Sequence, residues 1–157
     1  MNVKLITVGK TTFPFLKEGE KEYEGRLKHY MKFERIDIKE IKRSKNTTVE
    51  LLKKKEAELI SSTINDSDYI VLLDEKGTEL SSVQFSDWID KKMNLGHRSL
   101  VFLIGGAYGF DENIYNRSQE KISFSRMTFS HQMIRLLFLE QLYRANTILK
   151  GEKYHHT

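Results

Sequence analysis

Short apolar runs without polar alternation are the feature that most constrains this chain. Tyr69–Leu73 and Leu100–Ile104 are unbroken runs, and Val3–Val8 is largely apolar. A strand that is apolar on both faces must be covered on both faces, which is typical of a parallel sheet between two layers of helices. Segments with helical spacing separate these runs. The order therefore predicts repeated strand–helix units, an α/β fold, and ligands at the carboxyl ends of the strands.

The remaining elements are predicted from shorter signals. We expect further strands around Ile36–Ile38 and at Ile122–Ser125, and a turn at Asp74–Gly77. Helical spacing predicts one helix from near Pro14 to Met31 and another with Phe85, Trp88, Ile89 and Met93 on one face, entered through Ser81 and Ser82. A capping box, Thr47-x-x-Glu50, predicts the start of a lysine-rich helix that runs to about Ile64.

The last predicted helix, from about Ser130 to Leu149, has two apolar stripes. The first stripe contains Ile134, Leu137, Phe138, Leu142, Ala145 and Ile148, and the second contains Leu136, Leu139 and Tyr143. A helix with two such stripes needs cover on two sides. The sheet can cover one side, and we expect a second copy of the chain to cover the other.

Length, composition and charge exclude several classes of protein. The 157 residues predict a single domain over 1–157, and the absence of cysteine excludes disulfides and thiolate chemistry and favours the cytoplasm. No run approaches the ~18 apolar residues of a membrane span, so we expect no membrane association. Lys and Arg exceed Asp and Glu by six in residues 1–56 and by three in residues 118–157. Two basic ends favour an anion-binding surface, although a solvated lysine-rich helix also explains them.

A glycine cluster predicts the ligand site. Gly105, Gly106 and Gly109 follow a buried strand directly, where missing side chains let a ligand approach the backbone, although a tight turn explains them equally well. The strand ends after Leu73, Ile104 and Ser125 should converge on a cleft that suits an adenosine-like ligand. Gly9-Lys10-Thr11 lacks the earlier glycine of a phosphate-binding loop, so a nucleotide triphosphatase is set aside.

The histidines and the chain end have alternative interpretations. His131 and the adjacent His155 and His156 show no metal-binding spacing, so we expect no metal. The terminal Tyr154-His155-His156 could be a disordered tail. It could also combine with Arg135 and Arg144 for phosphate contact, base stacking and proton handling. Glu140 is predicted to pair with an arginine.

Six motifs in order carry a family resemblance. They are Leu73-Asp74-x-x-Gly77, Ser82-x-x-Phe85, Phe102-Leu103-Ile104-Gly105-Gly106-Ala107-x-Gly109, Met127-Thr128-Phe129-Ser130-His131-Gln132, Glu140-Gln141-Leu142-Tyr143-Arg144-Ala145 and Tyr154-His155-His156. Together they resemble the RlmH family of SPOUT-class methyltransferases along the full chain. The sequence departs from the family at Ser130, where many members carry proline.

The resemblance implies a fold, a reaction and a set of residues. It implies a C-terminal deep trefoil knot, an obligate homodimer, and transfer of a methyl group from S-adenosylmethionine to N3 of a pseudouridine in 23S rRNA. The cofactor pocket maps onto Leu73, Gly105, Gly106, Ser125, Arg126, Met127, Thr128, Phe129 and Ser130. Tyr154, His155 and Arg144 become candidate catalytic residues in a cleft shared with the other subunit, with His155 accepting the proton and Arg144 favouring the deprotonated base.

The substrate and the alternatives complete the sequence-based expectations. A chain this small favours an assembled ribosome over free RNA as the substrate. The first alternative is a ribosome-associated RNA-binding protein without catalysis. The second is a flavodoxin-like nucleotide binder.

Overall fold

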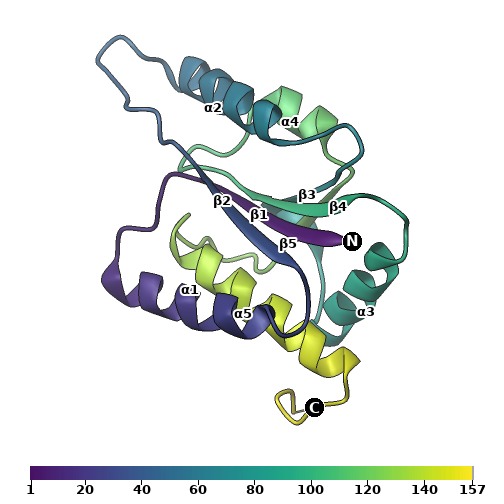
Figure 1. Cartoon of the computed structure of the whole chain (residues 1–157). Helices are drawn as coiled ribbons and strands as arrows, with labels where there is room; N and C mark the ends of the chain where they lie inside the picture. The colour runs from purple at the N-terminus through teal and green to yellow at the C-terminus, as the bar shows by residue number, and fades with distance from the viewer. Residues whose placement is uncertain (157) are drawn as a thin grey trace.

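A five-stranded sheet forms the middle layer of the computed structural model, which describes residues 1–156. Its strands are β1 (Asn2–Val8), β2 (Phe33–Ile38), β3 (Tyr69–Glu79), β4 (Ser99–Ile104) and β5 (Glu120–Ser123). They lie in the order β2-β1-β4-β3-β5, and each neighbouring pair is parallel. The predicted parallel α/β fold is confirmed, and the carboxyl ends of the strands share the edge on the left of Figure 1.

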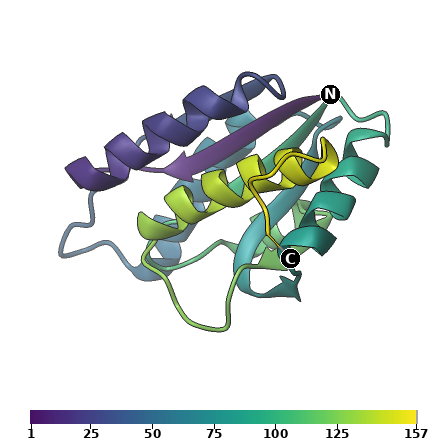
Figure 2. The same cartoon turned by 90° about the horizontal axis from the view of Figure 1, so that it is seen from below.

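Helices cover both faces of the sheet. They are α1 (Pro14–Leu27), α2 (Val49–Thr63), α3 (Ser82–Met93), α4 (Glu112–Arg117) and α5 (Met133–Leu149). Figures 1 and 2 show α1, α3 and α5 on one face and α2 and α4 on the other. All six residues of the central strand β4 are buried, as its unbroken apolar sequence requires. No helix within residues 1–156 has the length and apolar character to cross a membrane.

Two local predictions were wrong by small shifts in the chain. The helix α2 is capped by Thr48, whose hydroxyl accepts a hydrogen bond from the Leu51 N–H at 3.1 Å, and the predicted cap, Thr47, bonds Ser44 instead. The helix α5 begins at Met133 and not at Ser130, although the Ser130 hydroxyl still accepts from the Met133 N–H at 3.1 Å. Side-chain capping signals thus located the starts of α2 and α5 to within a few residues.

The predicted turn at Asp74–Gly77 was also wrong, because β3 continues as a strand to Glu79. Its register with β5 shifts between Leu73 and Thr78, so the polar residues form an irregular part of the strand. A Cβ atom on Gly77 would lie 2.6 Å from the backbone of Ile122. Glycine therefore permits the close approach of β3 and β5, and a polar, glycine-containing run does not have to be a turn.

The second apolar stripe of α5 is covered by α1 of the same chain, so the expectation that a second copy covers it was wrong. Leu139 is fully buried, and a Cβ on Gly19 of α1 would touch Leu136 at 3.0 Å. The ring of Tyr143 packs against those of Tyr23 and Tyr30, with centroids 5.9 and 5.6 Å apart. Periodicity shows that a stripe needs cover, but it does not identify the covering element.

Candidate functional site

A cleft of about 650 Å³ lies at the carboxyl edge of the sheet. Leu73 of β3 pairs with Ile104 of β4 on one side and with Ile122 of β5 on the other, and all three residues line the cleft. The predicted convergence of three strand ends is therefore confirmed. The volume of the cleft is within the roughly 300–1,000 Å³ that small-molecule sites occupy.

One wall of the cleft is the glycine turn after β4. The Gly109 N–H donates to the Gly106 carbonyl at 3.2 Å, and Gly109 has a φ of +80°, which favours glycine. A Cβ on Gly105 would lie 3.3 Å from the Phe110 ring, and one on Gly106 would lie 3.2 Å from the Glu56 carboxylate. The tight turn proposed as an alternative is real, and the same turn exposes backbone to the cleft.

The opposite wall is the segment between β5 and α5. The Ser123 hydroxyl donates to the Ser125 carbonyl at 2.9 Å, and the Ser125 hydroxyl accepts from the Met127 N–H at 2.9 Å. Side chains of this segment reach the mouth, where Met127 is 77% exposed and Phe129 is 41% exposed. The hydrogen bonds give this wall a defined shape before any ligand binds.

Eight of the nine predicted cofactor residues line this cleft, and Arg126 does not. The Arg126 side chain is 88% exposed and pairs with Glu79 at 3.0 Å. The eight that line it are Leu73, Gly105, Gly106, Ser125, Met127, Thr128, Phe129 and Ser130.

His131 also lines the cleft, although sequence reasoning considered it only as a metal ligand. Burial lowers the pKa of His131, and the positive charge of Arg135 lowers it further against the opposing effect of Glu40. A neutral imidazole on the cleft wall can accept a proton. Its position directly after the predicted loop was the available signal. Within residues 1–156 no cluster of three potential metal ligands is present.

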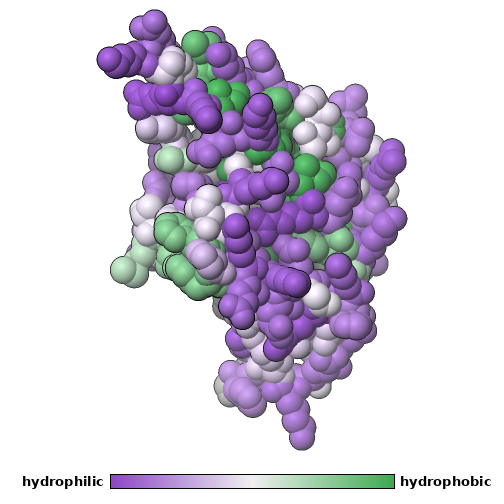
Figure 3. All heavy atoms as spheres, turned by 60° about the vertical axis from the view of Figure 1, so that its left-hand side comes forward, coloured by the Kyte–Doolittle hydropathy of each residue, from purple (hydrophilic) through white to green (hydrophobic). Residues whose placement is uncertain are grey.

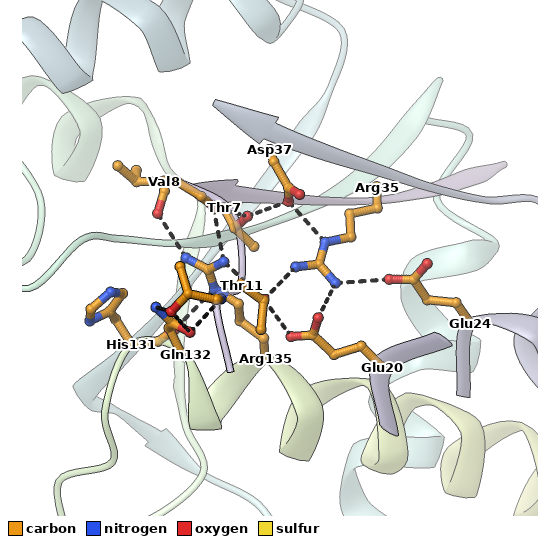
Figure 4. A network of polar contacts seen from close by, with 12 residues as sticks. Thr7, Val8, Thr11, Glu20, Glu24, Arg35, Asp37, His131, Gln132 and Arg135 are labelled. Carbon is orange, nitrogen blue, oxygen red and sulfur yellow. Dashed lines mark hydrogen bonds and ion pairs between the residues drawn. The ribbon is translucent and has the colours of Figure 1, made fainter. Parts of the chain in front are cut away.

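Arg135 was expected to contact phosphate, and this expectation was wrong because its side chain is fully buried. Its guanidinium donates to the carbonyls of Val8 at 2.7 Å and Gly9 at 2.9 Å, and its Nε donates to the carbonyl of His131 at 3.1 Å (Figure 4). It also donates to the Thr11 hydroxyl at 3.2 Å. Arg135 thus joins the end of β1 to the start of α5 and fixes one side of the cleft.

A second arginine extends this network away from the cleft. Arg35 of β2 forms ion pairs of 2.9 Å with Glu20, Glu24 and Asp37, and its side chain is 13% exposed (Figure 4). The Thr11 hydroxyl donates to Glu20 at 2.8 Å and so connects the two arginines. With three carboxylates around it, Arg35 has no free charge for a ligand.

The predicted catalytic residues lie together in a second cluster at the chain end. Arg144 pairs with Glu140 at 2.6 Å, as expected for Glu140, and contacts the Nδ1 atom of His155 at 3.3 Å. The Tyr154 hydroxyl donates to Glu140 at 3.0 Å and lies 3.2 Å from the hydroxyl of Tyr23. Tyr154 and His155 are therefore packed on α1 and α5, contrary to the disordered alternative. We call Glu140, Arg144, Tyr154 and His155 the tail cluster.

The tail cluster and the cleft lie apart in one chain. Ile134 on the cleft wall precedes Arg144 by ten residues of α5. At 1.5 Å per residue this corresponds to about 15 Å along the helix axis.

Within the tail cluster, hydrogen bonding to Glu140 raises the pKa of Arg144 and keeps it charged.

Comparison with known proteins places this architecture in a class. The chain matches, over residues 1–155, the family model described as predicted SPOUT methyltransferase. A protein from Cytophaga hutchinsonii is 53% identical over 156 residues, covering 99% of this chain and 100% of the relative. Proteins from Christiangramia forsetii and Parabacteroides distasonis are 53% and 52% identical, covering 99% of both chains. All three are named ribosomal RNA large subunit methyltransferase H.

The chain belongs to the SPOUT methyltransferase family. Within that family, full-length identity near 50% to these relatives confirms the RlmH resemblance found in the six motifs.

Proposed function

We propose that this protein transfers a methyl group from S-adenosylmethionine to N3 of a pseudouridine in 23S rRNA. The observation that carries the proposal is the cleft at the ends of β3, β4 and β5, which is lined by backbone and mostly uncharged side chains in a SPOUT chain. The names of its relatives support a large-subunit rRNA substrate. The nucleotide and the atom follow from the family resemblance, and the use of assembled ribosomes follows from the small size of the chain.

The residues of the cleft fit S-adenosylmethionine. Leu73, Ile104 and Ile134 supply apolar contacts for a flat adenine ring, and the turn at Gly105–Gly109 and the segment Ser125–Ser130 supply backbone donors and acceptors. Ser130 has a hydroxyl that is already engaged with the Met133 N–H, which stabilises the segment without proline. When bound, S-adenosylmethionine supplies a methyl group on a positively charged sulfur.

The chain must then handle the proton of N3. A protonated imide nitrogen is a poor nucleophile, so a base and a positive field favour the reaction. We assign His155 as proton acceptor and Arg144 as the group that stabilises the deprotonated base. Tyr154 can stack on the nucleobase, as its ring already does on the Arg144 guanidinium at 4.7 Å.

The separation between the two clusters supports a homodimer. A cleft in one chain and a tail cluster about 15 Å away along α5 cannot act on one methyl group. A second protomer can bring its own tail cluster to the cleft, and each dimer then has two composite sites. Because α1 covers the second stripe of α5, the dimer is supported by this separation and by the family resemblance.

We further propose the C-terminal trefoil knot that the resemblance implies. The strand β5 lies at the sheet edge beyond β3, whereas Arg135 near the start of α5 bonds the end of β1. Residues 124–132 therefore cross the carboxyl ends of β3 and β4, which a threaded helix requires. A crystal structure of the dimer tests this topology. When the two ends of one chain are joined outside the molecule, the path of the backbone either contains a trefoil knot or does not.

We expect the reaction to take place in the cytoplasm, in keeping with a chain without cysteine.

The function is tested by methyl transfer to ribosomes from cells that lack the protein. Labelled S-adenosylmethionine should yield one modified nucleotide in 23S rRNA, a pseudouridine methylated at N3, with no label on ribosomes from wild-type cells. Label elsewhere, or no label, would contradict the proposal. Calorimetry with S-adenosylmethionine separates it from a non-catalytic RNA-binding protein, and a colourless purified protein separates it from a flavin binder.

A further inference from the structure

The loop between β2 and α2, residues 39–48, has a surplus of positive charge. It carries Lys39, Lys42, Arg43 and Lys45, which are all exposed, against the single acid Glu40. Among residues 1–156, these four cations form no ion pair, whereas Arg26, Arg35, Lys92, Arg126 and Arg144 each pair with a carboxylate. We call residues 39–48 the basic loop. Four unpaired cations within seven residues repel one another, and an anion from outside the chain would remove that repulsion.

The basic loop is attached at the mouth of the cleft. The Arg43 guanidinium lies over the ring of Tyr108 at 5.5 Å and donates to its hydroxyl at 2.9 Å. Tyr108 is 48% exposed and lines the cleft. At the other end of the loop, Ser44 and Thr47 share a hydrogen bond of 2.7 Å. Arg43 therefore connects the basic loop to the rim of the site, and the Ser44–Thr47 hydrogen bond lies within the loop.

Exposed aromatic groups lie on the same edge of the sheet. Phe129 lines the cleft, and Phe13 and Phe15 at the start of α1 are 51% and 60% exposed. The Thr12 N–H donates to Gln132 at 2.9 Å and thereby joins this start to the segment before α5. Figure 3, which brings this edge forward, shows hydrophilic residues interspersed with hydrophobic ones at the top, and a pale hydrophobic patch lower on the left. Cations next to exposed rings suit phosphates next to unstacked bases.

We propose that the basic loop binds the phosphate backbone of the substrate rRNA and positions the target nucleotide at the cleft. This inference rests on the proposed function and adds a recognition surface to it. The lysines contact phosphates, and Arg43 with Tyr108 connects that contact to the wall of the cofactor cleft. Phosphate contacts fix register and orientation, which a small enzyme needs because it reads few bases.

The test replaces Lys39, Lys42 and Lys45 together by glutamine. The matched control replaces Lys28, Lys32 and Lys91, which are exposed at the opposite, amino-terminal edge of the sheet, so the net charge changes equally. We expect the loop variant to bind ribosomes lacking the modification at least about tenfold more weakly than the wild type. The slope of log binding constant against log salt concentration should become shallower by about one unit for each phosphate contact that is lost. Its affinity for S-adenosylmethionine should equal that of the wild type.

Co-sedimentation with ribosomes over a salt series measures the binding without catalysis. Unchanged affinity and salt slope in the loop variant, or an equal loss in the control variant, would overturn the inference. If the wild-type protein transfers no methyl group, the proposed function fails, and co-sedimentation still decides whether the loop binds rRNA. Circular dichroism confirms that both triple variants are folded.

Discussion

The cleft and the tail cluster differ in how their chemistry is organised. The cleft is lined by backbone groups, glycines and mostly uncharged side chains, with His131 as a neutral base. In the tail cluster, Glu140 and Arg144 are bonded to each other and to Tyr154 and His155. The cleft is thus mostly uncharged, whereas the charged side chains of the tail cluster lie elsewhere and are paired with one another. Under the proposed function, the cleft of one protomer and the tail cluster of its partner form one site.

The largest expected effect comes from adding a side chain in the cleft wall. The Cβ of Gly106→Val lies against the buried Glu56 carboxylate, so the substitution displaces the glycine turn. We expect S-adenosylmethionine binding to weaken at least about a thousandfold, on the order of 4 kcal/mol, in calorimetry. Gly25→Val is the matched control, because a Cβ at Gly25 meets nothing within 4 Å. Tight binding by folded Gly106→Val would show that the cofactor site is elsewhere.

Arg135 of α5 and Arg98, which precedes β4, should differ in their contribution to stability. Arg135→Met leaves the carbonyls of Val8 and Gly9 without their donor and should lower the free energy of unfolding by about 3 kcal/mol. Arg98→Met, at an exposed position, should change it by less than about 0.5 kcal/mol. Urea unfolding measures both. Equal stability of the two variants would mean that Arg135 does not hold the cleft edge.

Within the tail cluster, Arg144→Ala and His155→Ala should separate catalysis from cofactor binding. We expect methyl transfer to fall about a hundredfold in each variant, because the proton acceptor or the positive field is lost. Calorimetric affinity for S-adenosylmethionine should stay at the wild-type value, since neither residue lines the cleft of its own chain. His156→Ala, at an exposed position, is the control. Wild-type turnover in both variants would remove the tail cluster from the mechanism.

The smallest expected effect concerns Glu56, which lies behind the glycine turn. Burial raises the pKa of Glu56 above its ordinary value of 4.5, and the charge of Glu40 raises it further. Below pH 4.5 this carboxyl is protonated in both the folded and the unfolded chain, so it costs no stability. As the pH rises through the folded-state pKa, ionisation of the buried carboxyl lowers the free energy of unfolding. Glu56→Gln should therefore raise the free energy of unfolding at pH 7, by no more than about 1 kcal/mol.

Urea unfolding at pH 4 and pH 7 checks this sign. The difference between Glu56→Gln and the wild type should be larger at pH 7. Glu58→Gln, at an exposed position on the same helix, is the control variant. A variant that is less stable than the wild type at pH 7 would mean that the Glu56 carboxylate is held favourably as an ion.

The cleft could be predicted from the sequence largely because it is made of strand ends. An unbroken apolar run such as Leu100–Ile104 places a buried strand, and a parallel sheet brings the following residues to one edge. The polar continuation of β3 to Glu79 could not be predicted, because a close approach at Gly77 overrides turn propensity. The burial of Arg135 was missed for a related reason. Its partners Val8 and Gly9 lie more than 120 residues earlier in the chain.

The most direct test of a site shared between protomers is a heterodimer of two inactive variants. One protomer carries Gly106→Val, the other carries Arg144→Ala, and different affinity tags allow the mixed dimer to be purified. Each dimer then has one site with an intact cleft and an intact tail cluster, so methyl transfer to unmodified ribosomes should recover to about half of the wild-type rate. Activity no higher than that of either homodimer would contradict the shared site.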